Sequence, residues 1–336
     1  MPPIRDVMPA FELFQPASVS DALGVLNRHG ADAWVMAGGN DTFDWLKDRI
    51  KKPRVVVDLS MVNELNGIKD AGGGLEIGAT TTLTTIANHP MVKERFPMLA
   101  QAALIVASPQ IRNVSTLGGN VAQDARCSYY RAGWPCYRAG GNICYADTPQ
   151  AVNREHALFD ADRCVAVNPS DTAPALVALD AQFVIKNGDA ERVVSAEEFF
   201  IGPGIDITKL TSLQPGDLLT AIRIPNTFAG KPHYFEKVRD RMVWDFALVN
   251  IAASFNLSGS SIGDARMVVN GVSATPYRLN AVEAFLRGKP RDKATADQAA
   301  EMAVQGAVPL QHNAYKIPLM KALVKRAIRG DAEWTS

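Results

Sequence analysis

The chain has 336 residues, 47% of them hydrophobic, and its 35 basic side chains balance 35 acidic ones. Without a basic surplus we expect no general affinity for nucleic acid, and without an acidic surplus we expect no disordered acidic tail. No apolar run reaches the roughly 18 residues of a membrane span, and the first residues lack the apolar core of an export signal, so we expect neither.

The first part of the chain alternates between helical and strand patterns. After Ser18, apolar side chains recur on one helical face, and Gly30 follows the end of that pattern. In chain order, the sequence predicts a helix at 18–30, a buried strand at 34–37, a glycine turn at 38–42, a helix at 41–50 and a strand at 54–59.

The middle of the chain carries a second glycine turn and then a long stretch with little apolar periodicity. A loop of that length within a compact domain is commonly functional. The patterns predict a strand at 74–79, a helix capped near Thr82, a helix at 97–107, the second glycine turn at 116–121, a loop at 124–165, a helix at 172–180 and a strand at 182–186.

The last third follows residues 226–232, whose Pro, Gly and Asn content makes them the best candidate linker. Beyond this linker the sequence predicts strands at 249–257 and 266–272, then helices at 277–287 and 313–328. Strands followed by helices indicate an α+β C-terminal domain.

All four cysteines lie within 38 consecutive residues, at Cys127, Cys136, Cys144 and Cys164. A chain of this length buries a sizeable core without disulfides, which favours a metal or cluster site. The stretches between the cysteines are eight, seven and nineteen residues long, without the CxxC pairs typical of structural zinc. Three arginines and no acidic residue lie between 125 and 146, and such cations offset the charge of a four-thiolate cluster. An iron–sulfur cluster is favoured, and zinc or two disulfides stay open.

The two glycine pairs, Gly38-Gly39 and Gly118-Gly119, match neither the dinucleotide fingerprint GxGxxG nor the P-loop. Each nevertheless offers backbone N–H groups that no Cβ shields, which suits a pyrophosphate. The alternative is that both pairs only form tight turns. Polar side chains flank the two pairs: Asn40, Thr42, Thr116 and Asn120.

Five motifs in order resemble those of the flavin-binding subunits of molybdenum hydroxylases, a family that includes xanthine dehydrogenase, carbon monoxide dehydrogenase and aldehyde oxidoreductases. They lie at 37–41, 77–83, 109–120, 169–171 and 237–241, and the resemblance runs from about residue 10 to 330. It implies an α+β fold, with a FAD-binding domain of the PCMH (vanillyl-alcohol-oxidase-like) type at 1–225, subdomains at about 1–62 and 63–225, and a CO dehydrogenase flavoprotein-type C-terminal domain at 230–336, with a small sheet and helices.

The resemblance also implies which residues bind FAD, and we expect non-covalent binding because neither glycine turn contains His or Cys. Residues 35–42 would wrap the pyrophosphate, and residues 106–107 would lie near the flavin ring. Lys237 would place a positive charge near the flavin and tune its potential. The implied set is Val35, Met36, Ala37, Gly38, Gly39, Asn40, Asp41, Thr42, Thr81, Val106, Ala107, Thr116, Gly118, Gly119 and Asn120, with Asp171 as a hydrogen-bond acceptor, Leu219 in the pocket wall and Lys237.

The cysteine-bearing insertion at 124–165 resembles two subgroups of the family that carry a [4Fe-4S] cluster there. These are the flavin subunits of periplasmic-type aldehyde oxidoreductase and of 4-hydroxybenzoyl-CoA reductase. Short stretches beside three cysteines, with 237–241 and 313–316, are more similar to the aldehyde oxidoreductase type. The implied cluster ligands are Cys127, Cys136, Cys144 and Cys164.

The implied function is electron transfer within a heterotrimer that oxidises aldehydes. Substrate would be oxidised at a molybdopterin centre in a large partner subunit. Electrons would then pass through the [2Fe-2S] clusters of a small partner to the FAD here and on to an external acceptor. No residue of this chain is expected to be catalytic. We expect a cytoplasmic protein, or a periplasmic one if a signal-bearing partner carries the folded complex across the membrane.

Alternatives within the family are the flavin subunit of an aromatic acyl-CoA reductase or of an N-heterocycle or xanthine-type dehydrogenase. Of a different class are a free-standing flavoprotein oxidase with a zinc-stabilised loop and a non-enzymatic metal-binding scaffold. The five histidines lack metal-ligand spacing and are expected to be structural or exposed: His29, His89, His156, His233 and His312.

Overall fold

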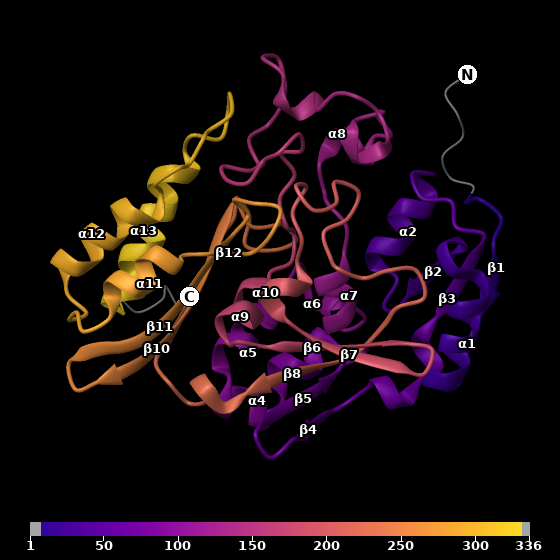
Figure 1. Cartoon of the computed structure of the whole chain (residues 1–336), viewed down its shortest axis with the longest axis horizontal. Coiled ribbons are helices and arrows are strands. Elements are labelled where there is room, and N and C mark those ends of the chain that lie inside the picture. Colours follow the sequence, from indigo (N-terminus) through magenta and orange to yellow (C-terminus); the bar gives the residue numbers. More distant parts are fainter. Residues whose placement is uncertain (1–7, 331–336) are drawn as a thin grey trace.

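The computed structural model describes residues 8–330, which fold into three sheets with helices packed against them (Figure 1). The first sheet is parallel, with strand order β1-β3-β2. Its part of the chain contains β1 (Glu12–Phe14), α1 (Val19–His29), β2 (Ala33–Met36), α2 (Asn40–Lys47) and β3 (Val55–Asp58). The predicted order of helix, strand, turn, helix and strand is confirmed here.

Local sequence explains how α1 packs on this sheet. The Ser18 side chain accepts a hydrogen bond from the Asp21 backbone N–H at its start, and Gly30 follows its end with a φ of 51°. Leu26 on the apolar face packs in one buried cluster with Val57 of β3. This packing fixes the sheet, so that the carboxyl end of β2 leads directly into the first glycine pair.

The second sheet is antiparallel, with strand order β4-β5-β8-β6-β7, and its helices enclose the largest apolar core. Its strands are β4 (Ile68–Asp70), β5 (Gly74–Gly78), β6 (Gln182–Asn187), β7 (Ala190–Ser195) and β8 (Leu218–Pro225). Its helices are α3 (Leu83–Asn88), α4 (Pro90–Arg95), α5 (Pro97–Leu104), α6 (Pro109–Arg112), α7 (Leu117–Ala122), α9 (Ala173–Ala178) and α10 (Ala196–Phe199).

The third sheet is antiparallel, with strand order β12-β11-β10-β9, and α11 to α13 pack with it in a second core. Its elements are β9 (His233–Val238), β10 (Val249–Ser258), β11 (Ser261–Asn270), β12 (Tyr277–Arg278), α11 (Asn280–Leu286), α12 (Lys293–Ala303) and α13 (Lys316–Arg329). The expected α+β architecture is confirmed, with a C-terminal part that has a small sheet and helices.

The third sheet also shares the core of the second. Phe235, Ala252 and Val268 are cross-strand neighbours on β9, β10 and β11, and all three belong to the apolar cluster around the second sheet. The connecting segment 226–232 is packed rather than a free linker, because Phe228 is buried in that cluster. The two parts of the chain therefore bury one continuous apolar surface.

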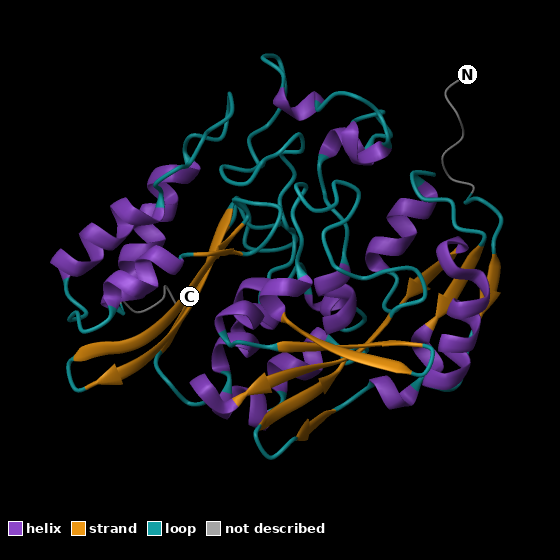
Figure 2. Cartoon of the chain, viewed as in Figure 1, coloured by secondary structure: helices purple, strands orange, loops and turns teal. Residues whose placement is uncertain are grey.

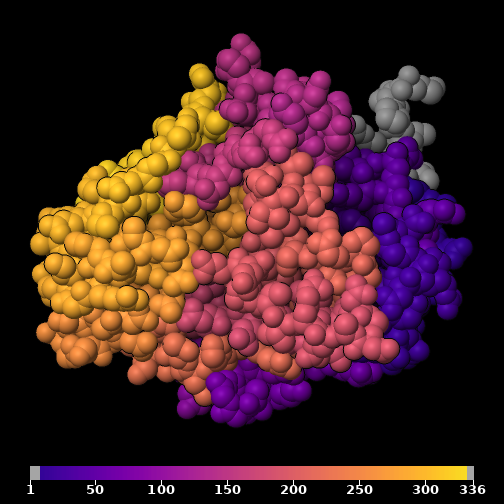
Figure 3. Space-filling view, in the orientation of Figure 1, coloured from indigo at the N-terminus to yellow at the C-terminus, as the bar shows by residue number. Residues whose placement is uncertain are grey.

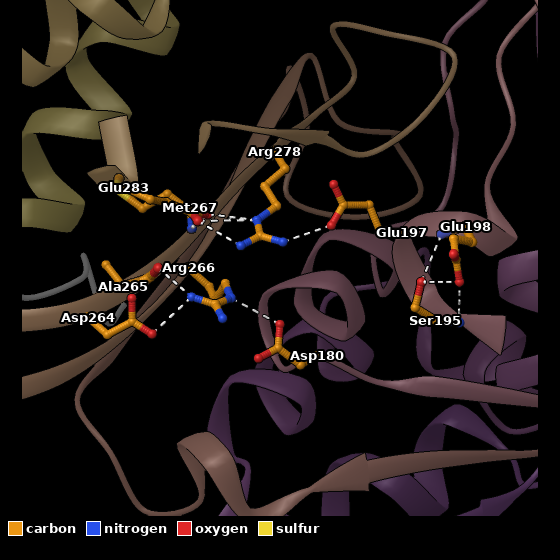
Figure 4. A network of polar contacts seen from close by, with 10 residues as sticks. All are labelled: Asp180, Ser195, Glu197, Glu198, Asp264, Ala265, Arg266, Met267, Arg278 and Glu283. Atoms are coloured by element: carbon orange, nitrogen blue, oxygen red, sulfur yellow. Dashed lines mark hydrogen bonds and ion pairs between the residues drawn. The ribbon is translucent and has the colours of Figure 1, made fainter. Parts of the chain in front are cut away.

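Two arginines add polar links across the same junction (Figure 4). Arg266 Nε lies 3.0 Å from Asp180 Oδ1, beyond the end of α9. Arg278 Nη1 lies 2.7 Å from Glu197 Oε2 on α10, and its other nitrogens donate to Glu283 on α11. These contacts set the angle at which the C-terminal sheet meets the second subdomain.

The cysteine-bearing segment 124–165 is mostly irregular, as expected, and forms the raised upper edge of the molecule (Figures 2 and 3). It contains one short helix, α8 (Ser128–Arg131), and two 3₁₀ turns at Tyr137–Ala139 and Tyr145–Asp147. The Trp134 ring packs edge-on against Tyr145, with 4.7 Å between ring centroids. Aromatic packing therefore orders a segment that has little regular structure.

Two local predictions are wrong. Strand β2 is half-exposed rather than buried, with Val35 37% exposed, because its apolar side chains line the cleft described below. The second glycine pair lies in the first turn of α7 rather than in an open turn, since the Thr116 side chain caps this helix at the Gly119 N–H. Within residues 8–330, no helix combines the length and apolar character that crossing a membrane requires.

Candidate functional site

A cleft of about 490 Å³ lies between the N-terminal sheet, the second subdomain and the cysteine segment. This volume falls within the usual range for small-molecule sites. Its walls take residues from the β2–α2 turn, from the turns after β5 and α5, from 111–126, and from loops at 169–171, 213–219 and 244–246.

The first glycine pair brings the β2–α2 turn against the opposite wall of the cleft. A β-carbon built on Gly38 would lie 2.2 Å from the carbonyl oxygen of Val114, so only glycine fits. Gly39 has a φ of 77°, where glycine is favoured. Asn40 Nδ2 donates to Ser115 Oγ at 2.7 Å across the same junction. The turn opens α2, whose first N–H groups lack partners inside the helix and suit a phosphate.

The second glycine pair allows close packing, but its backbone N–H groups are already hydrogen-bonded inside the protein. The Gly118 N–H donates to the carbonyl of Ala79 at 2.8 Å, and the Gly119 N–H donates to Thr116 Oγ1 at 3.0 Å. Two N–H groups expected to be free for a phosphate are thus used inside the protein. The pair instead lets α7 approach the turn after β5, because a β-carbon on Gly118 would lie 2.8 Å from the Ala79 oxygen.

The wall at 106–107 is held by two arginines and a tryptophan. Arg112 Nη1 donates to the Val106 carbonyl at 2.7 Å, and Arg239 Nη1 donates to the preceding carbonyl at 2.9 Å. Ala107 and Trp244 both have positive φ, at 40° and 76°, and the Trp244 N–H donates to the Ala107 carbonyl. Burial and the neighbouring Arg239 lower the pKa of Arg112. Strained non-glycine backbone held this firmly is typical of a binding wall.

Lys237 and Asp171 form a buried ion pair behind the cleft. Lys237 Nζ lies 2.6 Å from Asp171 Oδ2, and the two side chains are only 1% and 4% exposed. Burial raises the pKa of Asp171, whereas Lys237 opposes that rise. Asp171 reaches the cleft wall and Lys237 does not. The Lys237 side chain is therefore buried and paired rather than solvated at the surface.

The cysteine segment contributes charged groups to the cleft. Asp124 and Arg126 both line it. Asp124 lies 3.3 Å from Lys51 Nζ and contacts Arg138 directly. Burial raises the pKa of Asp124, but Arg138 and Lys51 outweigh this effect, so the pKa lies below its usual range. Asp124 is therefore a fixed negative charge with two cationic partners.

The four cysteines are free thiols. Burial raises the pKa of Cys127 to about 11, and the thiols of Cys164 and Cys144 add to the increase. Burial also raises the pKa of Cys164, with contributions from Cys144 and Cys136. His156 Nε2 lies 3.3 Å from Cys127 Sγ. Among residues 8–330, no three His, Cys, Asp or Glu side chains are grouped so that they could hold one metal ion.

The end of the cysteine segment is fixed to the C-terminal part. Asn313 Nδ2 donates to the carbonyls of His156 and Ala157, both at 3.0 Å. Lys316 Nζ donates to the His156 carbonyl at 3.0 Å and to the Gly271 carbonyl at 2.6 Å. Lys316 is fully buried, and burial lowers its pKa from 10.5 to about 7. Asn313, just before α13, and Lys316, at its start, therefore hold the backbone of His156, whose ring contacts Cys127.

Substituting Lys316 with methionine should flatten the dependence of stability on pH. The unfolded chain keeps a proton on Lys316 up to about pH 10.5, and the folded chain only up to about pH 7. The wild type should therefore gain stability relative to Lys316→Met as the pH rises from about 7 to about 10, and the difference should stay constant below pH 7. Urea unfolding of both proteins across this range measures the difference, and parallel profiles would contradict the expectation.

The structure brings most of the predicted FAD residues to one cleft. All of them line it except Met36, Thr81 and Lys237. The Thr81 hydroxyl is instead hydrogen-bonded to the backbone N–H and carbonyl of Gly67, at 2.9 and 3.0 Å.

Sequence reasoning missed several residues at the site. Trp34, Asp124, Arg126, Trp244 and Phe246 line the cleft. Arg126 and Asp124 had a usable signal, because Arg126 directly precedes the first cysteine and Asp124 lies three residues before it. His156 had none, since its contact with Cys127 depends on a fold of the loop that no local pattern encodes.

Two family models match almost the whole chain. One is described as the FAD binding domain in molybdopterin dehydrogenase and matches residues 9–227. The other is described as the CO dehydrogenase flavoprotein C-terminal domain and matches residues 233–330. The matched ranges meet at the packed segment after β8.

Known proteins and solved structures agree with these matches. The chain is 34% identical to the aldehyde oxidoreductase FAD-binding subunit PaoB of Escherichia coli K12, over 85% of this chain and 87% of that protein. It is 28% identical to the carbon monoxide dehydrogenase medium chain of Hydrogenophaga pseudoflava, over 98% of each. The structure of quinoline 2-oxidoreductase from Pseudomonas putida 86 superposes with a TM-score of 0.75 at 28% identity, covering 96% of each chain. The chain therefore belongs to the FAD-binding medium subunits of the molybdenum hydroxylase family, whose members are subunits of oxidoreductases.

Proposed function

We propose that the chain is the electron-transfer subunit of a heterotrimeric, molybdenum-containing complex that oxidises aldehydes. A large molybdopterin subunit would oxidise the substrate, and a small [2Fe-2S] subunit would pass the electrons to this chain. The observation that carries the proposal is the cleft, whose close glycine junction suits a diphosphate and whose apolar wall at 106–107 suits a ring system. FAD supplies the ability to take up electrons singly and release them in pairs to an external acceptor.

The chain's own residues would bind and orient the cofactor. Residues 37–42 would hold the diphosphate, as their place in the cleft wall supports. Thr116, Gly118, Gly119 and Asn120 would line the diphosphate and ribityl end, without donating the two glycine N–H groups. Val106 and Leu219 would pack against the ring. Asp171, fixed by Lys237, would accept a hydrogen bond at a defined place.

We further propose that the cysteine segment holds a [4Fe-4S] cluster through its four thiols. A tetrahedral zinc ion with bonds of about 2.3 Å needs tightly grouped ligands. No such group occurs among the described residues. Cys127 and Cys164 both pack against one buried apolar cluster, and Cys127 also packs against the cluster that contains Cys136. Arg138 opposes the rise in the pKa of Cys164, as a cation beside a negatively charged cluster would. This donor set fits a cluster of four irons better than a single ion.

The aldehyde assignment rests on the 34% identity with an aldehyde oxidoreductase subunit and on the four cysteines in the insertion. The second candidate is an N-heterocycle dehydrogenase, which the likeness to quinoline 2-oxidoreductase supports. Co-purification of the chain with the products of its neighbouring genes separates them. We expect the complex to contain flavin, iron and molybdenum and to reduce an artificial dye with aldehydes but not with xanthine or quinoline. A preparation without flavin absorption, or one that uses only heterocycles, would contradict the proposal.

Cys136→Ser should remove most of the iron and acid-labile sulfide of this chain, because a hydroxyl is a poor ligand for iron in such a cluster. Iron and sulfide analysis of the anaerobically purified full chain, without partners, measures the loss. The neighbouring substitution Tyr137→Phe keeps all four thiols and serves as the control, with iron content unchanged. Equal iron in Cys136→Ser and the wild type would show that the ligand assignment is wrong, and one zinc per chain would support the free-standing oxidase instead.

A further inference from the structure

A carboxylate lies in the turn that is proposed to wrap the diphosphate. Asp41 is in the first turn of α2 and lines the cleft. Asp44 lines the same wall one turn later. Unopposed negative charges here would repel a diphosphate, and the repulsion would be strong because the cleft is partly shielded from water.

Two arginines of the cysteine segment meet this carboxylate. Arg126 Nη1 lies 3.0 Å from Asp41 Oδ1, and Arg131 Nη2 lies 2.5 Å from the same oxygen. Trp45 Nε1 donates to the other carboxylate oxygen at 2.9 Å. The Arg126 and Arg131 side chains are 30% and 14% exposed, so both are partly removed from solvent.

Both guanidinium groups are fixed by aromatic rings as well. Arg131 lies 3.9 Å from the centre of the Trp45 ring, and Arg126 lies 4.3 Å from the centre of the Phe246 ring. Two like charges held this close together need an anion between or beside them.

The charged side chains at this wall form two separate groups. Asp124 is matched by Lys51 and Arg138, so these cations are already engaged. Asp41 and Asp44 are then left with Arg126 and Arg131, and Arg126 also lies 4.0 Å from Asp44. Removing either arginine would leave one of the carboxylates of Asp41 and Asp44 without a matching cation beside the first glycine pair.

We propose that Arg126 and Arg131 complete the FAD site by neutralising Asp41, so that the cysteine segment is itself part of the flavin-binding machinery. The inference rests on the proposed position of the diphosphate at residues 37–42. A purely structural ion pair would anchor the segment without affecting flavin affinity. The two roles therefore predict different results for variants that change charge and variants that keep it.

The test is FAD binding by the full chain, measured by quenching of flavin fluorescence in apoprotein titrations at low and high salt. Arg126→Gln should weaken binding about tenfold at low salt, and less at high salt where charges are screened. Arg126→Lys keeps the charge and should stay within about threefold of the wild type. Arg54→Gln removes one positive charge from an arginine that is 81% exposed directly before β3, and should have no effect.

A second substitution separates charge from packing. Asp41→Asn combined with Arg126→Gln removes both charges and should bind FAD within about threefold of the wild type. Equal affinity for FAD in Arg126→Gln and the wild type would overturn the inference. A double variant that binds FAD no better than Arg126→Gln would overturn it as well. If the wild type itself failed to bind FAD, the proposed cofactor site would fall, which is a different outcome.

Discussion

Gly38→Ala will lower the affinity for FAD by about a hundredfold or more. The added β-carbon would lie 2.2 Å from the Val114 oxygen, and its next neighbours, the Val114 carbon and Ser115 Cα, are also backbone atoms. No side chain can rotate to relieve this clash, so the two walls must separate, and the hydrogen bond from Asn40 to Ser115 is strained or lost. The flavin content per chain after gel filtration, and the dissociation constant of the reloaded protein, measure the effect.

Two other glycines calibrate this result. Gly24→Ala places a methyl group on α1 with no heavy atom within 4 Å, so we expect normal flavin content and a small gain in helix stability. A β-carbon on Gly119 would meet only Thr116 Oγ1 at 3.0 Å and Ala37 Cβ at 4.0 Å. Because Gly119 lines the cleft, we expect the larger side chain of Gly119→Leu to occupy the cleft and expel FAD. Full flavin occupancy in Gly38→Ala would contradict the close junction as the diphosphate site.

Lys237→Met will destabilise the protein by about 3–5 kcal/mol, because it leaves the Asp171 carboxylate buried without its cation. Asn250 Nδ2 lies 3.4 Å from the other Asp171 oxygen and is too weak a partner to replace an ammonium group. Asp171 would therefore take up a proton, and its hydrogen bonding toward the cleft would change. Urea unfolding gives the loss of stability.

Lys293→Met provides the matched control, because Lys293 pairs with Asp297 at the surface and its side chain is 80% exposed. We expect a change of less than about 0.5 kcal/mol there. A loss at position 237 as small as that at position 293 would mean that the buried pair contributes little. Lys237→Met combined with Asp171→Asn should recover part of the loss, since no buried charge is then left unpaired.

Local sequence patterns predicted those helices and strands whose structure depends on interactions between residues close together in the sequence. Helix α1 has its cap, its apolar face and its terminal glycine within the sequence of the helix itself, and its bounds agree with the prediction. Helix α12 was missed although its signal is present. Asp292 caps its start, and Ala296, Ala299 and Ala303 recur at helical spacing on the buried side. Alanine is a weak hydrophobic signal, so the pattern escapes a search for large apolar residues.

The errors near the cleft have a common cause. The apolar residues of β2 predict burial, but they face a cavity that a ligand would fill, and hydrophobicity does not distinguish a core from such a wall. The glycines after Thr116 predict a turn because glycine lowers helix propensity, yet the cap and the close approach to Ala79 favour a helix. Functional sites are where local rules are expected to fail.

Contacts between distant segments account for the rest. The pairing of Lys237 with Asp171 joins positions 66 residues apart, and the reach of Arg131 to Asp41 spans 90 residues. Nothing in either local sequence marks its partner. The resemblance to a family placed both segments near a flavin, but the pairs themselves depend on the packing of three sheets.

The sheet of β9 to β11 uses both of its faces, one against α13 and the other, through the stripe of Phe235, Ala252 and Val268, against the core of the second sheet. A protein truncated near position 230 would therefore expose this hydrophobic surface to solvent and would be prone to aggregate. Exchanging this C-terminal part between homologues should succeed only when the surface of the second sheet's core that contacts the stripe is exchanged as well. During evolution, substitutions in the stripe and in the facing surface of the second sheet's core would have to compensate for one another.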